Sequence, residues 1–206
     1  MIIPLNIVTS YPVNWTRYQV LRDFVQNFYD SVGFRDFNTR FQYQYHAEDH
    51  ALNISVEHIV FNYEWLLHIG ASTKQVDQNH AGYFGEGFKM AALCAQRDYS
   101  WQIYMRSGDW EFNVTTTDHQ IDDTTLKMLA YDVRTAEKRD ESCLIIKGLS
   151  DTDYHLFENV ILSFYYPENP LFGELLWEDF SGAVYSRSDV PIPPELPCTY
   201  KFGRRG

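Results

Sequence analysis

The chain has 206 residues, of which 45% are hydrophobic and 17% aromatic, so it is long and apolar enough for one folded domain and is not a disordered protein. Its formal charge of −11 argues against direct nucleic-acid binding, which depends on neutralising phosphates with Lys and Arg, although a local basic cluster can still bind one nucleotide. It contains no apolar run long enough to span a membrane and no secretory signal, so the cytoplasm is the expected compartment.

The first part of the chain predicts a strand followed by an amphipathic helix. Ile2 to Val8 is typical of a short strand, and a helix opened by Asn14 or Thr16 should end at Gly33. Its apolar residues recur every three or four positions, as expected for a helix with one buried face. These are Val20, Leu21, Phe24, Val25, Phe28 and Val32. Two strands and a short helix are expected next, at residues 40–45, 52–61 and 64–69.

The second part predicts a helix to about Arg97 and then mostly strands. Ser107-Gly108-Asp109 is a hairpin signal between two β-rich runs. Ser150, with Asp153 three residues later, should cap a helix that runs to about Phe164. Strands are expected at residues 100–105, 110–116, 129–133, 143–147, 173–177 and 183–186, with a polar connection at 118–125.

Three polar residues share one side of the early helix. Asp23 and Asn27 are four residues apart, and Asp30 follows three later. Such a stripe is usually solvated. It also suits a carboxylate that positions water, an amide oxygen that binds Mg²⁺, and a second acid near a nucleotide.

A glycine-rich loop precedes the central helix. Gly82, Gly85 and Gly87 are spaced G-x-x-G-x-G, and Phe88 and Lys89 lead into the apolar helix. Glycine lets a ligand approach the backbone, and a helix N-terminus favours phosphate. The loop is therefore either a phosphate cradle or a plain turn.

Together, these segments resemble the GHKL (Bergerat-fold) ATPases, in the style of the heat-shock chaperones and MORC proteins. Residues 22–31 are similar to the N box, the glycine loop to the later glycine box, and residues 69–74, with Ser72 and Lys74, to the segment after the first glycine box. Order and spacing agree from about residue 16 to 97. The resemblance implies an α+β two-layer sandwich with helices on one face of a mixed β-sheet. It also implies ATP and Mg²⁺ as ligands, and a protein partner or homodimer.

The resemblance breaks at the box that reads adenine in this superfamily. The D-x-G-x-G pattern is replaced by residues 55–66, which hold no glycine, and Glu57 is the nearest carboxylate in register. In the last box the usual Gly-Thr is replaced by Ser142-Cys143, which puts Cys143 at the threonine position.

The catalytic position also differs from the superfamily pattern. Asp23 replaces the glutamate that orients the attacking water, and it is shorter by about 1.5 Å, a misplacement that can cost about a hundredfold in rate. We therefore expect slow hydrolysis or none. Asn27 would bind the Mg²⁺, and Lys74 and Lys89 are candidate contacts of the γ-phosphate.

Residues 1–206 are predicted to form a single domain with a proline-rich tail at 189–206, where the chain could be truncated. Three functions remain open. The first is a nucleotide-operated switch with slow ATPase activity, in which a lid at residues 72–81 closes over ATP and creates a surface for a partner or a second copy. The second is a pseudo-ATPase scaffold for protein interaction. The third is a histidine kinase acting on a separate protein.

Overall fold

The computed structural model of the chain describes residues 1–67, 86–179 and 182–194. The strands of its large sheet are β1 (Ile2–Val8), β2 (Phe41–His46), β3 (Ala51–Glu57), β4 (Gln102–Ser107), β5 (Trp110–Ile121), β6 (Thr124–Thr135) and β7 (Glu141–Lys147). The helices are α1 (Arg17–Val32), α2 (Phe37–Arg40), α3 (Glu64–Leu67), α4 (Glu86–Tyr99) and α5 (Asp151–Leu162). A separate hairpin consists of β8 (Phe172–Asp179) and β9 (Gly182–Arg187).

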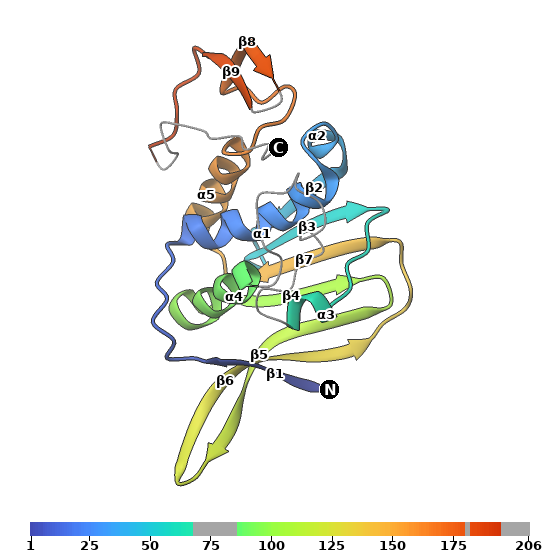
Figure 1. Cartoon of the computed structure of the whole chain (residues 1–206), viewed down its shortest axis with the longest axis vertical. Helices are drawn as coiled ribbons and strands as arrows, with labels where there is room; N and C mark the ends of the chain where they lie inside the picture. Colours follow the sequence, from blue (N-terminus) through green and yellow to red (C-terminus); the bar gives the residue numbers. More distant parts are fainter. Residues whose placement is uncertain (68–85, 180–181, 195–206) are drawn as a thin grey trace.

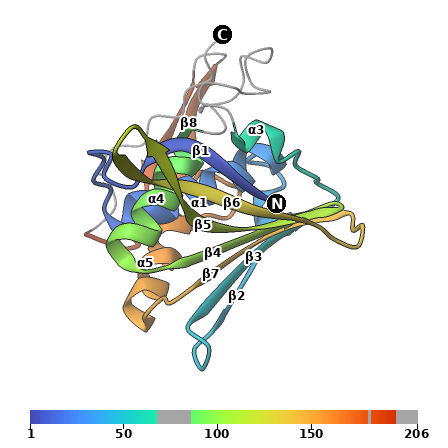
Figure 2. The same ribbon diagram turned by 90° about the horizontal axis from the view of Figure 1, so that it is seen from below.

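The protein is an α+β two-layer sandwich, as the sequence predicts. The sheet has the order β1-β6-β5-β4-β7-β3-β2. Helices α1, α4 and α5 lie on one face of it, and α1 contacts both of the others (Figures 1 and 2). No helix within the described ranges combines the length and the apolar character needed to cross a bilayer.

The sheet is antiparallel throughout, so the prediction of a mixed sheet is wrong. β7 lies between β3 and β4 and pairs antiparallel with both. β3 and β4 therefore run in the same direction without touching each other. The long connection through α4, which would ordinarily join two adjacent parallel strands, spans this inserted strand instead.

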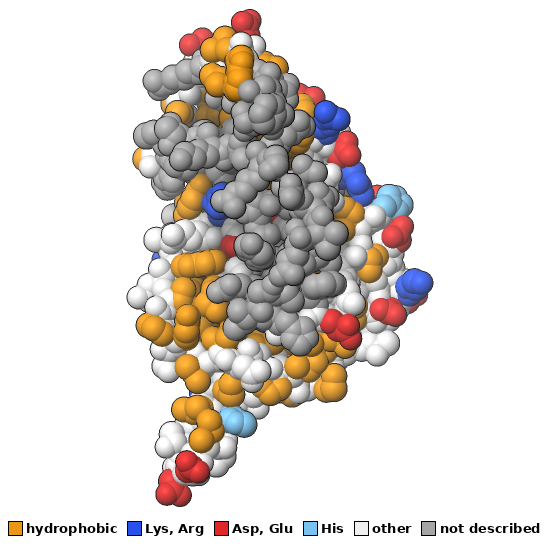
Figure 3. Space-filling model, in the orientation of Figure 1, with side chains coloured by type: hydrophobic (Ala, Val, Ile, Leu, Met, Phe, Trp, Pro, Cys, Tyr) orange, Lys and Arg blue, Asp and Glu red, His pale blue; other side chains and the backbone are white. Residues whose placement is uncertain are grey.

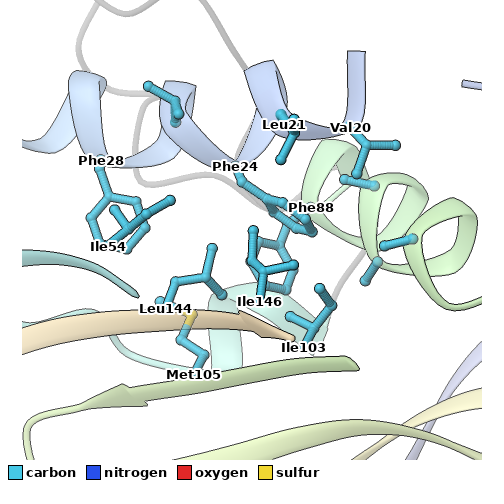
Figure 4. Close-up of a cluster of buried hydrophobic side chains, with 14 of the residues drawn as sticks. Val20, Leu21, Phe24, Phe28, Ile54, Phe88, Ile103, Met105, Leu144 and Ile146 are labelled. Carbon is cyan, nitrogen blue, oxygen red and sulfur yellow. The ribbon is translucent and has the colours of Figure 1, made fainter. Parts of the chain in front are cut away.

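The core lies between the helices and the sheet. Side chains alternate along a strand, and on β3 the residues that face the helices are Leu52, Ile54 and Val56, all completely buried. The buried face of α1 lies over them, and its Phe24 meets Phe88 of α4 edge to face, with ring centroids 5.3 Å apart (Figure 4). Burying each such phenyl group contributes about 1.5–3 kcal/mol, so this layer contact is a main source of stability.

The two predicted helix caps are confirmed. Thr16, not Asn14, caps α1: its hydroxyl accepts from the Gln19 N–H, and the Gln19 side chain accepts from the Thr16 N–H. Ser150 and Asp153 form the same reciprocal pair at the start of α5. Each cap satisfies backbone donors that the first turn of a helix leaves unpaired.

The connection predicted at residues 118–125 is instead the end of a long β-arm. β5 and β6 stay paired up to Ile121 and Thr124, and a two-residue turn follows in which Asp122 has a φ of 49°. Past Thr117 and Met128, no strand in the described part of the chain pairs with the arm, since β4 and β1 pair only with its base. Neither face of the outer arm is buried, so its sequence shows no alternation of apolar and polar residues.

The strand predicted at 52–61 ends at Glu57. His58 has a φ of 57°, a left-handed conformation that strand pairing does not accommodate. Its N–H donates to the Asp140 carbonyl, 2.8 Å away. The chain then crosses the ends of β7 and β4 as a short segment, Ile59 to Phe61, which we call the strap.

Two buried serines fasten the strap to the sheet, and we call them the serine relay. The Phe61 N–H donates to Ser107 Oγ, and Ser142 Oγ donates to the Ile59 carbonyl, both at 2.7 Å. The two hydroxyls are themselves 2.7 Å apart, and both serines are fully buried. The Trp110 indole N–H adds a bond to the Phe61 carbonyl at 2.9 Å.

Ser142→Ala should lower the free energy of unfolding by about 1–3 kcal/mol, because it leaves a buried carbonyl and a buried hydroxyl without their partner. Urea denaturation measures this. Ser55→Ala is the matched control. Ser55 lies on the adjacent strand β3, but its side chain points away from the helices, so the substitution should cost less than about 0.5 kcal/mol. Equal effects of the two substitutions would show that the relay does not hold the strap.

Candidate functional site

The most specific feature of the predicted site is a close approach between α1 and α4. A Cβ built on Gly87 would lie 2.4 Å from Asp23 Oδ1 and 3.1 Å from Asp23 Cγ. Only glycine allows this contact, since real Cβ atoms do not come so near. Asp23 of the polar stripe on α1 and Gly87, the last glycine of the loop, are therefore neighbours in the structure, although they are 64 positions apart in the sequence.

Local packing fixes the two helices in this position. In each helix the next residue adds to the contact: the Phe24 and Phe88 rings pack together (Figure 4). Phe88 also meets Phe112 of β5, with ring centroids 6.1 Å apart. Phe88 is thus a core residue of α4, 2% exposed, and it serves the site by holding α4 against α1.

Arg97 ties the far end of α4 to the segment before α1. Its guanidinium donates to the backbone carbonyls of Thr9, Tyr11 and Val13, and it pairs with Asp98. That pairing raises the pKa of Arg97 above its ordinary value, so the clamp stays charged. Both ends of the α1–α4 pair are therefore anchored.

Asn27 lies one helical turn beyond Asp23 on the same stripe. Its Nδ2 donates to the Asp23 carbonyl at 2.9 Å, which orients the half-buried amide. Oδ1, the atom that suits Mg²⁺, is therefore on the other side of the amide from this bond. Asp30 follows another turn on and accepts from Gln26 Nε2 at 2.8 Å.

Lys89 lies in the first turn of α4 and is completely shielded from solvent. The other lysines in the described part of the chain are exposed. An ammonium group so buried is costly unless it is paired, which makes Lys89 the most unusual charged side chain of the described lysines. The same turn carries backbone N–H groups and the positive end of the helix dipole, which favour an anion.

Two predicted site residues lie on the opposite face of the sheet. Glu57 is exposed at the end of β3, and its neighbour Val56 faces the helices instead. Cys143 likewise faces away, and Ser142 faces the helices. Burial and the nearby Glu141 raise the pKa of the Cys143 thiol to about 11.

The structure does not bring Glu57 and Cys143 together with Asp23. Val56 and Ser142 precede Glu57 and Cys143 in the sequence, face the helices, and are direct partners in the β3–β7 register. Sequence reasoning did not select these two residues. Strand alternation was the signal that could have found them: Leu52, Ile54 and Val56 share one parity, and so do Ser142, Leu144 and Ile146.

The remaining predicted residues lie outside the described ranges. These are Ser72, Lys74, Gly82 and Gly85, together with the predicted lid at 72–81. Of the residues predicted to form a phosphate cradle, the structure describes Gly87, Phe88 and Lys89. Among the described residues, no group of three or more His, Cys, Asp or Glu side chains could hold a metal ion by itself.

Comparison with known proteins gives a fold resemblance only. No protein-family model and no curated protein matches the sequence. Among solved structures, the ATPase region of Saccharomyces cerevisiae topoisomerase II matches with a TM-score of 0.36 and 12% identity, over 68% of this chain and 39% of that one. The same region bound to ICRF-187 (dexrazoxane) matches with the same values. This chain thus matches about two fifths of their length, and a similarity of this size carries no information about function.

A double-mutant cycle tests the contact of Asp23 with Gly87 without any ligand. Gly87→Ala forces the Asp23 carboxylate to move, and this cost offsets the gain of up to about 1 kcal/mol that alanine brings to a helix. In an Asp23→Ala background the clash is absent. We therefore expect Gly87→Ala to be more stabilising there than in the wild type, by at least about 0.5 kcal/mol in urea unfolding. Additive effects would show that the two residues do not touch.

Proposed function

We propose that the chain is a GHKL-type nucleotide-binding domain that takes up ATP with Mg²⁺ at the α1–α4 contact and acts as a conformational or dimerisation switch, with slow hydrolysis or none. The observation that carries the proposal is the packing of Asp23 against Gly87. This contact brings Asp23 of the segment that resembles the N box next to Gly87 of the glycine loop, as the resemblance requires. It does not depend on the similarity to solved structures.

The described residues fit the phosphate and metal end of such a ligand. Gly87 leaves a cradle without a Cβ, and the first turn of α4 offers N–H donors and the buried Lys89 to phosphate oxygens. Asn27 Oδ1 would supply a metal contact, and Mg²⁺ accepts a single protein ligand because phosphates and water complete its shell. When bound, Mg²⁺ would neutralise phosphate charge.

Within this proposal Asp23 has two functions. Its carboxylate would orient a water molecule near the terminal phosphate, from a shorter side chain than the usual glutamate. Its backbone carbonyl already positions the Asn27 amide. As a switch, the domain can be biased tenfold only if the ligand binds one form about 1.4 kcal/mol better than the other.

A scaffold without nucleotide binding is the second candidate, and the adenine end of the site favours it. Val56, fully buried and apolar, faces the helices where a carboxylate would read the base. An acid beside the N-terminus of a helix also stabilises the helix by itself, so Asp23 has a structural role in either case. A thermal-shift titration separates the two candidates, because a ligand at 100 times its Kd stabilises by about 2.7 kcal/mol and a scaffold would show no shift with ATP, ADP or an analogue.

Asn27→Ala should abolish Mg²⁺-dependent ATP binding, because it removes the amide oxygen offered to the metal. Isothermal calorimetry with and without Mg²⁺ measures this, with thermal unfolding of the free protein as the check on folding. Asn38→Ala is the matched control, since Asn38 lies on α2 and bonds to Glu168. Unchanged affinity in Asn27→Ala would remove the proposed metal contact.

Asp23→Ala should leave ATP binding within about threefold of wild type while eliminating turnover, because a group that orients water acts in the reaction rather than in binding. Phosphate release at saturating ATP and Mg²⁺ reports turnover. If the variant hydrolyses ATP as fast as the wild type, Asp23 does not position the water.

A further inference from the structure

The large sheet has one edge that is both open and regular. β2 is its last strand, and Figure 2 shows it at the border of the sheet. All its residues, from Phe41 to His46, pair in register with β3 and without a bulge. Within the described ranges, no strand pairs with its other side. β2 therefore presents a straight row of backbone donors and acceptors to which a further strand can pair.

The other two free edges of this sheet are blocked in the ways that proteins ordinarily use. β1, at the opposite border, contains Pro4, and its register with β6 shifts beyond that residue, where Asn6 has a φ of 57°. The outer arm carries the charged pair Asp118 and Lys127. Proline, bulges and charges all hinder strand pairing. β2 contains neither proline nor any Asp, Glu, Lys or Arg.

Contacts with α5 fix the conformation of β2 from one face. The Tyr45 ring stacks on Tyr154, with centroids 4.6 Å apart. The Tyr43 ring meets Phe157 edge to face at 5.1 Å. The tyrosines of the strand thus face the helices, and its two glutamines are exposed on the opposite face of the sheet. A strand that is already ordered loses little conformational freedom when it pairs.

We propose that two copies of the chain associate through antiparallel pairing of their β2 strands, which joins their sheets into one. The inference goes beyond the proposed function, because pairing of two backbone edges needs no nucleotide. A two-fold axis perpendicular to the sheet relates the copies, so each residue lies opposite one that points to the same face.

The sequence of β2 complements itself in such a pair. With the axis at Gln44, aromatic side chains lie opposite aromatic ones and uncharged polar side chains lie opposite uncharged polar ones. The facing pairs are Gln44 with Gln44, Tyr43 with Tyr45, and Gln42 with His46. Cross-strand pairs of this kind stabilise a sheet, and none of them brings like charges together.

The charges at the two ends of β2 match in the same register. Arg40 precedes the strand, and its guanidinium donates to the Glu57 carbonyl at 2.7 Å, which holds the positive group at this end. Glu48, exposed in the turn after the strand, comes opposite Arg40 of the second copy. The axis repeats this pair on the other side. Opposite charges at the contact favour association of two chains that each carry a net charge of −11.

Sedimentation equilibrium of the unmodified protein without nucleotide tests the inference, and we expect a reversible dimer. Gln44→Lys places two like charges at the axis and should weaken the dimer Kd by at least about fivefold. Asn113→Lys is the matched control, since Asn113 is exposed on β5, which pairs on both sides there. It adds the same charge and should change the Kd by less than about twofold. Thermal unfolding checks that both variants are folded.

A cross-link tests the register. Opposite residues of antiparallel strands lie within the Cα distance that a disulfide requires. Under mild oxidation, Gln44→Cys should therefore give a covalent dimer in which mass spectrometry finds position 44 joined to position 44. Asn113→Cys should give no more covalent dimer than the wild type.

Three results would overturn the inference. A protein that stays monomeric at about 1 mM would leave the β2 edge to a strand from another protein. Equal weakening by Gln44→Lys and Asn113→Lys would place the contact elsewhere. A dimer that forms only with ATP and Mg²⁺ and tolerates Gln44→Lys would instead support the nucleotide switch.

Discussion

The close approach of Asp23 to Gly87 is the constraint on which the rest of the candidate site depends. It places the start of α4 against the middle of α1, and this alignment in turn brings Phe88 onto Phe24 and into the core. A glycine in the first turn of a helix costs stability relative to alanine, about 1 kcal/mol in an exposed helix interior. Any side chain at position 87 would displace the Asp23 carboxylate. Glycine is therefore present where the two helices meet, although it destabilises α4.

The two ends of the site have different physical characters. At one end, a carboxylate, an oriented amide and a buried ammonium lie around the N-terminus of a helix. At the other, valine, phenylalanine and the backbone of the strap fill the space above the sheet, and two serines use their hydrogen bonds on the protein itself. The two serines therefore stabilise the fold by bonding the strap to the sheet.

The features that sequence reasoning predicted well are local ones. The helix caps at Thr16 and Ser150 depend on residues three positions apart in the sequence. The buried face of α1 follows from the spacing of its own apolar residues. The α+β sandwich and the pairing of Asp23 with the glycine loop needed the resemblance, because no local rule joins residues so distant in the sequence. Glu57 and Cys143 missed the helix-facing side by one position each, since moving one residue along a strand reverses the face. The position of β7 between β3 and β4 was missed, because sheet order depends on tertiary packing. The length of the arm was missed because a solvated hairpin has no apolar pattern.

The arm formed by β5 and β6 has a practical consequence. Its outer part carries exposed polar side chains, its tip is the acidic pair Asp122 and Asp123, and it projects away from the helices (Figures 1 and 3). Exposed hairpin tips tolerate inserted residues, because no buried backbone has to be rearranged. A fluorescent dye or affinity peptide introduced between Asp122 and Asp123 would therefore report on the protein from outside its core, leaving the α1–α4 contact as it is.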